Sequence, residues 1–154
     1  MTNLRIMFGR VIFWMAWPLW FVYLRGSLRT RVLVEAEGKI LLIQGWHGGG
    51  KWSFPGGGVH KGEQPARSAV REVAEETGIR LDAKQLTDLG QDIYKKNGLR
   101  FKMSYYGCRL QERPTTRKQH LEIAALNWFH ISDITEAIVK PQAWQHPQPW
   151  KFAR

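Results

Sequence analysis

Three glutamates, Glu72, Glu75 and Glu76, lie within five positions of a chain that is otherwise strongly basic. In an α-helix, positions 72 and 76 are one turn apart on the same side, where like charges destabilise an isolated helix by roughly a few tenths of a kcal/mol. Carboxylate oxygens gathered on a rigid helix suit a hard divalent cation. The simpler interpretation is a solvated acidic face softened by Arg67 and Arg71, and three acids alone favour that interpretation.

A helix that carries these glutamates is predicted from about Pro65 to Thr77. Proline suits the first turn of a helix, and Gly78 suits the left-handed position that follows the last turn. At about 100° per residue, small and apolar side chains collect on one face, and the glutamates fall on the adjoining face. The residues of the apolar face are Ala66, Ala69, Val70, Val73 and Thr77. We therefore expect one side of this helix to pack and the other to concentrate negative charge.

The residues around the helix complete a longer pattern. Its nine fixed positions are Gly57, Glu63, Arg71, Glu72, Val73, Glu75, Glu76, Gly78 and Ile79. With ordinary residue frequencies, a chance match in a chain of this length is on the order of one in 10⁷. The sequence therefore resembles the Nudix hydrolase family, whose signature box it matches over residues 57–79. The order of the expected strands extends the resemblance to about residues 30–140.

The resemblance implies a fold and an activity. The fold would be α/β, an α/β/α sandwich with a mixed β-sheet, and the activity would need Mg²⁺ or Mn²⁺. The reaction would be water attack at phosphorus on a nucleoside diphosphate linked to another moiety. Such cleavage requires that phosphate charge be neutralised and a water activated, and divalent cations with oxygen ligands do both. The sequence carries no clear subfamily signature for NADH, ADP-ribose or coenzyme A.

The resemblance also implies which residues would bind the metal. Glu75 and Glu76 would be the main ligands, and Glu72 would be a ligand or the general base. The backbone carbonyl of Gly56 would be a further ligand, since glycine lets backbone approach closely. Family members often add one Glu from a later strand or loop, and the best candidate here is Glu122, both as a ligand and as a catalytic residue. A surface acid on an edge strand is the alternative for that position.

Two more box residues would orient the site. Glu63 and Arg71 are expected to form an ion pair, because a guanidinium can hold a carboxylate through a two-pronged hydrogen bond. Glu112 is a weaker candidate than Glu122 for the additional glutamate from a later strand or loop. His60, inside the box loop, is expected to be a surface residue rather than a phosphate contact.

Composition sets the wider limits. The chain has 154 residues, 44% of them apolar, which is enough for one domain with a buried core. Its net charge of +10 favours partners that carry phosphate, namely nucleotides, RNA or anionic lipid. Removal of pyrophosphate or a cap from RNA 5′ ends is therefore the alternative enzymatic function. A single cysteine, Cys108, excludes an intrachain disulfide framework and fits the cytoplasm.

The N-terminal extension, residues 1–29, lies outside the resemblance. Residues 11–24 are apolar on all sides and are flanked by Arg10 and Arg25. Fourteen helical residues reach about 21 Å, short of the roughly 30 Å of a bilayer core. The segment is expected to contact a membrane surface, at the inner face, or to dock on this domain or on a second copy in a homodimer. A true crossing or signal anchor is the third alternative. The apolar segment also motivates a non-catalytic, membrane-associated nucleotide-binding module as an alternative function.

The rest of the chain is expected to form the Nudix domain, residues 30–140, and an irregular tail, residues 141–154. Strands are predicted at 30–36, 39–46, 92–96, 99–110 and 121–131, the first two joined by a turn at Glu37 and Gly38. A short helix is predicted at 132–140 with Ser132 as its N-cap. Trp46 and Trp52 flank a Gly-rich loop. Core packing is the favoured interpretation for both, and stacking on a base is the alternative.

Overall fold

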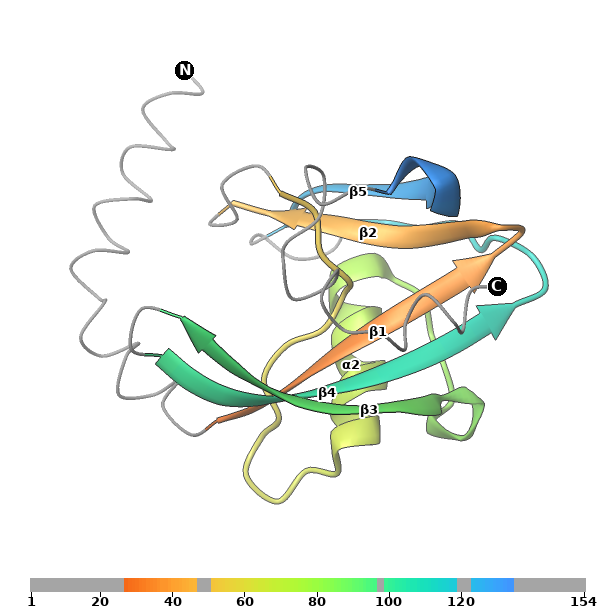
Figure 1. Cartoon of the computed structure of the whole chain (residues 1–154). Coiled ribbons are helices and arrows are strands. Elements are labelled where there is room, and N and C mark those ends of the chain that lie inside the picture. Colours follow the sequence, from red (N-terminus) through yellow and green to blue (C-terminus); the bar gives the residue numbers. More distant parts are fainter. Residues whose placement is uncertain (1–26, 47–50, 97–98, 119–122, 135–154) are drawn as a thin grey trace.

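The computed structural model describes residues 27–46, 51–96, 99–118 and 123–134 (Figure 1). The elements are the strands β1 (Leu28–Ala36), β2 (Lys39–Gly45), β3 (Thr87–Lys96), β4 (Leu99–Leu110) and β5 (Ile123–His130), the helix α2 (Pro65–Thr77), and the 3₁₀ turns η1 (Ala83–Gln85) and η2 (Ile131–Asp133). The sheet has the order β3-β4-β1-β2-β5. β1 and β4 are parallel and the other neighbours are antiparallel, so the sheet is mixed, as expected.

The apolar segment at residues 11–24 lies outside the described residues, as do Glu122 and the tail. Within the described ranges, no helix combines the length and the apolarity that crossing a membrane requires.

The predicted turn between the first two strands is confirmed. Glu37 and Gly38 both have positive φ, 52° and 71°, which is the backbone of a type I′ turn. The Gly38 N–H donates to the Glu35 carboxylate at 3.1 Å, which stabilises the turn. β1 and β2 pair only at two positions next to it, Glu35 with Ile40 and Ala36 with Lys39.

Beyond these two pairs the strands separate into two branches, β1-β4-β3 and β2-β5, which we call the fork (Figure 1). The segment after the Gly-rich loop connects the two branches. Ser53 pairs with Ile43 of β2, and Gly58 pairs with Arg29 of β1. Val32 N also donates to the Pro55 carbonyl at 2.9 Å. The segment from Ser53 to Gly58 is therefore fixed to both branches of the sheet through isolated backbone pairs.

The helix α2 has the bounds that the sequence predicts. Pro65 occupies the first turn, and Gly78 ends the helix at φ 78°, with its N–H donating to the Ala74 carbonyl at 3.0 Å. The buried side chains Ala69 and Val73 pack against strand residues of both branches; these are Val32, Val34, Leu41 and Tyr106. One helical layer thus covers one face of the sheet and holds the fork in shape.

The prediction of a helix beginning at Ser132 is wrong. The Ser132 hydroxyl donates to the Asp133 carboxylate at 3.0 Å instead of capping a helix, and both residues lie in η2. Ile134 then has extended dihedrals, φ −83° and ψ 116°, and its buried side chain packs with Leu33 and Phe54. Core packing of Ile134 therefore takes the place of the expected first turn, and residues 135–140 lie outside the described residues.

Candidate active site

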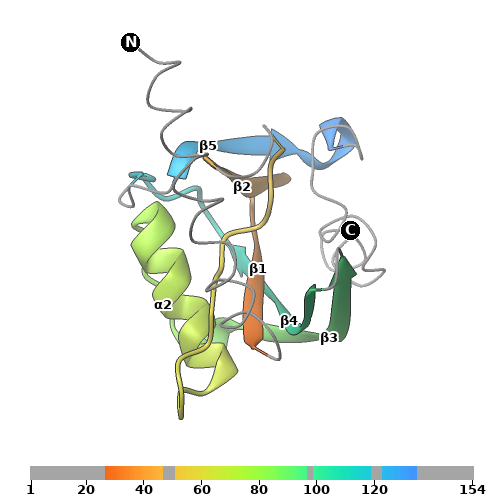
Figure 2. The same cartoon turned by 90° about the vertical axis from the view of Figure 1, so that its left-hand side faces the viewer.

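The loop at residues 56–58 lies between β1 and α2 and is bonded to both (Figure 2). On the strand side, Thr30 N donates to the Gly57 carbonyl at 2.8 Å. On the helix side, Gly56 N donates to Glu76 Oε2 at 2.7 Å, and Ser68 Oγ donates to the Gly58 carbonyl at 3.0 Å. The backbone of the loop is therefore held at a fixed distance from the glutamate face of the helix.

Two of these glycines are required for that approach. Gly56 has φ 137°, and a Cβ there would lie 2.3 Å from the Thr30 carbonyl oxygen. A Cβ on Gly57 would lie 2.4 Å from the carboxylate carbon of Glu72. A Cβ on Gly58 would have no described atom within 4 Å. The absent side chains of the first two residues thus leave room for β1 and for the Glu72 carboxylate.

Arg71 joins the acidic residues of the box. Its Nε and Nη2 donate to the two carboxylate oxygens of Glu63 at 3.0 and 3.1 Å, the two-pronged pairing that the sequence predicts. Its Nη1 donates to Glu72 at 2.9 Å and to Glu75 at 3.2 Å. Its Nη2 also donates to the Gly58 carbonyl at 3.0 Å. One guanidinium therefore orients three carboxylates and the loop.

The pairing with Arg71 lowers the pKa of Glu63 to about 2, and a backbone N–H from His60 adds to this effect. Glu63 is therefore ionised in the folded protein at any pH near neutrality. The same pairing raises the pKa of Arg71 above its usual range. His60 itself is exposed, with its Nδ1 3.8 Å from Glu63, as expected for a surface histidine.

We expect Glu63→Gln to lower the thermal midpoint by a few degrees at pH 7. The folded pKa of Glu63 lies below its ordinary value of 4.5, so its stabilising contribution is complete above pH 4.5 and is lost as the pH falls towards 2. The difference in midpoint between the two proteins should therefore shrink between pH 4.5 and pH 3. Thermal unfolding followed by circular dichroism checks this, with Glu112→Gln, the same change at an exposed position, as a control. A difference that grows on acidification would contradict the ion-pair account.

Glu76 is in a different environment from the other glutamates. Burial raises its pKa to about 7, although Arg31 and the Gly56 N–H act in the opposite direction. Arg31 also donates from β1 to the Gly56 carbonyl. Arg31 is not among the site residues that the sequence predicts. The signal was strand alternation, since Thr30 and Val32 are fully buried and the residue between them must point to the opposite face.

The acidic side chains do not converge on one point as they stand. Among the described residues, no group of three His, Cys, Asp or Glu side chains has the spacing of a metal site. The glutamates of α2 are directed to different partners, because Arg71 donates to Glu72 and Glu75 while Glu76 accepts the Gly56 N–H. The oxygen donors are nevertheless of the kind that Mg²⁺ and Mn²⁺ bind.

Three further residues that the sequence singles out, one glutamate and two tryptophans, differ in their exposure. Glu112 is exposed in the segment between β4 and β5. Trp52 packs edge-on against Phe129, with ring centroids 4.8 Å apart, which agrees with the core interpretation. The position of Trp46 disagrees with the core interpretation, since 54% of its surface is exposed.

The chain is similar to known proteins over most of its length. The family model described as NUDIX domain matches residues 28–151, more than half of the chain. A Xenopus laevis protein, "Nucleoside diphosphate-linked moiety X motif 6", is 33% identical over 105 residues, which cover 67% of this chain and 48% of that protein. The Schizosaccharomyces pombe "mRNA decapping complex subunit 2" is 31% identical over 125 residues, covering 70% of this chain and 16% of that protein. The chain thus spans about half or less of these two relatives.

A solved structure gives the same picture of the fold. The crystal structure of a MutT NUDIX hydrolase from Burkholderia pseudomallei matches with a TM-score of 0.70 at 24% identity. The match covers 79% of this chain and 95% of that one, so the two share an architecture.

Proposed function

The chain belongs to the NUDIX domain family, and we propose that it is a pyrophosphohydrolase that cleaves the diphosphate linkage of a nucleoside diphosphate joined to another moiety, with Mg²⁺ or Mn²⁺. One observation carries the proposal. Glu76 accepts the Gly56 N–H, and the Glu72 carboxylate lies so close to Gly57 that a side chain there has no room. The name of a relative supports the substrate class, since that protein is named for a nucleoside diphosphate-linked moiety.

The residues present fit a divalent cation. Glu76 is a desolvated carboxylate whose pKa is raised, so a cation beside it would supply the charge that burial leaves uncompensated. Glu72, Glu75, Glu76 and the Gly56 carbonyl would hold the ion, with Glu122 as the proposed further ligand. When bound, the metal supplies neutralisation of phosphate charge and a lowered pKa for water.

The chain's own residues have separate tasks in this proposal. Glu72 accepts a proton from the attacking water if it is not itself a ligand, and Arg71 fixes its carboxylate at 2.9 Å. Glu63 keeps Arg71 in that position through two hydrogen bonds. Arg31 places a positive charge beside the Gly56 carbonyl, where phosphate charge would gather.

The proposal is tested by release of phosphate and nucleotide from a substrate panel. Purified protein with Mg²⁺ or Mn²⁺ would be given nucleoside triphosphates, oxidised nucleotides, nucleotide sugars, dinucleoside polyphosphates and 5′-triphosphate RNA. We expect turnover of one class of nucleotide derivative, abolished by EDTA. Turnover that persists in EDTA, or none on any compound, would contradict the proposal. Nucleotide binding without turnover would favour the non-catalytic module.

RNA 5′ ends are the second candidate substrate. The net charge of +10 favours a polyanion, and one relative is named as a decapping subunit. If RNA is the substrate, its KM should rise steeply between about 50 and 200 mM salt, because each phosphate contact releases counterions. A small nucleotide should show a much weaker dependence on salt.

A further inference from the structure

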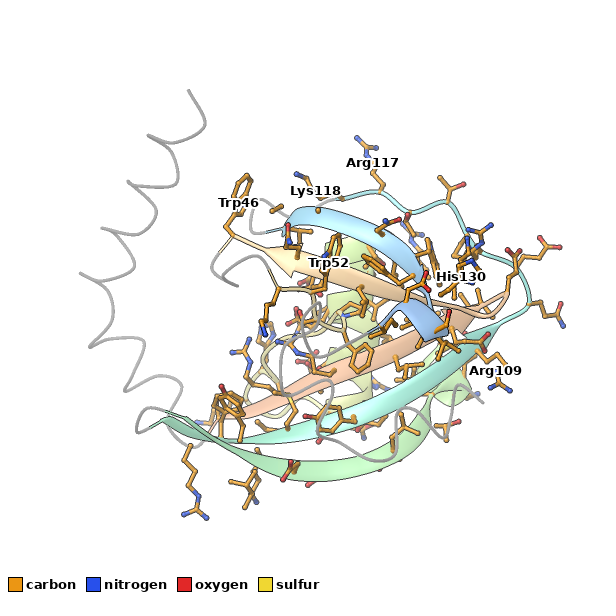
Figure 3. All side chains as sticks on the ribbon, turned by 45° about the horizontal axis from the view of Figure 1, so that its top comes forward. Trp46, Trp52, Arg109, Arg117, Lys118 and His130 are labelled. Carbon is orange, nitrogen blue, oxygen red and sulfur yellow. The ribbon has the colours of Figure 1, made fainter. Side chains whose placement is uncertain are left out.

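Trp46 is unlike the other described tryptophans in its exposure. It follows directly after the last residue of β2, and 54% of its surface is exposed to solvent. Trp52, the other tryptophan beside the Gly-rich loop, is partly buried and packs edge-on against Phe129. Figure 3 shows Trp46 projecting from the end of its strand, with Trp52 farther inward. The structure thus separates the two tryptophans, since Trp52 packs in the core while more than half of the Trp46 surface is exposed to solvent.

Lys118 is held beside this ring. Its Nζ lies 5.9 Å from the ring centroid of Trp46, within the range of a cation–π contact. The same Nζ donates to the Ala124 carbonyl of β5 at 3.3 Å. Lys118 therefore bridges β5 and the indole, and it occupies one side of the ring. A flat ligand would stack on the exposed part and would have a cation at its edge.

This pair is joined to the carboxylate helix. Arg117, the residue before Lys118, donates its backbone N–H to the Thr77 carbonyl at 2.9 Å. Thr77 directly follows Glu76 and is the last residue of α2. Lys118 therefore directly follows a residue that is bonded to the last residue of the helix carrying the proposed metal ligands, and Figure 3 shows Lys118 and Trp46 close together.

We infer that Trp46 and Lys118 form a stacking subsite for the nucleobase of the substrate, an inference that rests on the proposed function. An indole stacks on any base through its π-face, and it buries more area against a purine than against a pyrimidine. The subsite would thus favour purine nucleotides without reading their hydrogen-bonding edges. The sugar and phosphates would extend towards Glu76. A protein partner seated on the exposed ring is the competing occupant.

Binding measurements separate the base from the rest of the nucleotide. Isothermal titration would use AMP and ribose 5-phosphate, which differ by the base, with the wild type, Trp46→Ala and Trp46→Phe. We expect Trp46→Ala to weaken AMP binding about 10-fold or more and to leave ribose 5-phosphate unchanged. Trp46→Phe, which keeps an aromatic face, should stay within about threefold of wild type. Lys118→Met should weaken AMP binding by about 2- to 5-fold.

Ile93→Ala is the matched control. Among the described residues, Ile93 is the other large apolar residue that is strongly exposed, at 44%. It lies on β3, in the other branch of the fork. It should bind both compounds as the wild type does. Equal AMP affinity in the wild type and Trp46→Ala would overturn the inference. So would equal weakening of both compounds, or a wild type that binds neither.

Kinetic measurements distinguish failure of the stacking subsite from failure of the proposed function. On the nucleotide that the panel identifies, Trp46→Ala should raise KM about 10-fold with kcat within about threefold of wild type, since the ring contacts substrate away from the reacting phosphorus. An enzyme that turns over nucleotides with an unchanged KM in Trp46→Ala retains the proposed function and loses the subsite. A protein that binds AMP through Trp46 but hydrolyses nothing retains the subsite and loses the function.

Discussion

Glu76→Gln is expected to lower kcat at least about 10³-fold while the metal-free protein stays as stable as the wild type, or becomes more stable, at pH 8. The loss of activity follows from removing one charge from a proposed metal ligand, because an amide oxygen binds Mg²⁺ more weakly than a carboxylate does. The amide oxygen can still accept the Gly56 N–H, which lies 2.7 Å from Glu76 Oε2. The loop should therefore keep its place against α2.

The stability effect has a definite sign. The folded pKa of Glu76 is about 7, above its ordinary value of 4.5, so the folded state binds more protons than the unfolded state between these values. The metal-free wild type therefore loses stability as pH rises through this window, by at most about 3 kcal/mol. The amide of Glu76→Gln does not ionise. The free energy of unfolding of the metal-free variant should therefore equal that of the wild type near pH 4.5 and be larger at pH 8.

Thermal unfolding at several pH values, with and without Mg²⁺, checks both parts. Added Mg²⁺ should raise the midpoint of the wild type and should have little effect on Glu76→Gln. Glu112→Gln, at an exposed position in the segment between β4 and β5, serves as the control and should behave as the wild type does in every assay. A variant that keeps full kcat, or that unfolds far below the wild type at pH 8, would contradict the role assigned to Glu76.

The second large effect is expected from a series of alanine substitutions at three consecutive glycines. Gly57→Ala should lower kcat/KM about 10²-fold with a small change in thermal midpoint. Its Cβ would lie 2.4 Å from the Glu72 carboxylate, and that group is the far end of a flexible side chain that can turn away. The fold would then survive while the carboxylate leaves the position that catalysis requires.

The two neighbours calibrate this result. At Gly56 the obstacle is backbone, the Thr30 carbonyl oxygen at 2.3 Å, and φ is 137°, so Gly56→Ala should unfold the protein or lower its midpoint by more than about 10 °C. At Gly58 a Cβ meets nothing described within 4 Å, so Gly58→Ala should be active and stable. If Gly57→Ala and Gly58→Ala have the same activity, the space beside the Glu72 carboxylate has no catalytic importance.

Much of the fold could be predicted because its signals are local. The bounds of α2 follow from Pro65 and Gly78, since each has backbone requirements that the ends of a helix satisfy. The turn at Glu37 and Gly38 could be placed for a similar reason, because two short β-rich runs flank it. The resemblance to the Nudix family implied the pairing of Glu63 with Arg71, which the structure contains.

The features that could not be predicted depend on contacts distant in sequence. β3 begins at Thr87, five residues before the predicted start, because its polar first half is held by pairing with β4 across a bulge at Asp88 and Gly90. The two branches of the fork separate because β1 and β2 are paired at only two positions beside their turn, and the sequence does not show where this pairing stops. The exposure of Trp46 and the partial burial of Trp52 depend on tertiary contacts, of which the packing of Trp52 against Phe129 is one.

The proposed function depends on the attack of water at phosphorus in a diphosphate linkage with the help of a divalent metal. The most direct measurement is cleavage of the substrate in H₂¹⁸O with Mg²⁺, followed by mass spectrometry of both products. We predict one ¹⁸O atom per cleavage, located on a phosphate oxygen, and no labelled product when EDTA is present. Label on a carbon atom of the sugar or of the other moiety, or undiminished labelling in EDTA, would contradict the account.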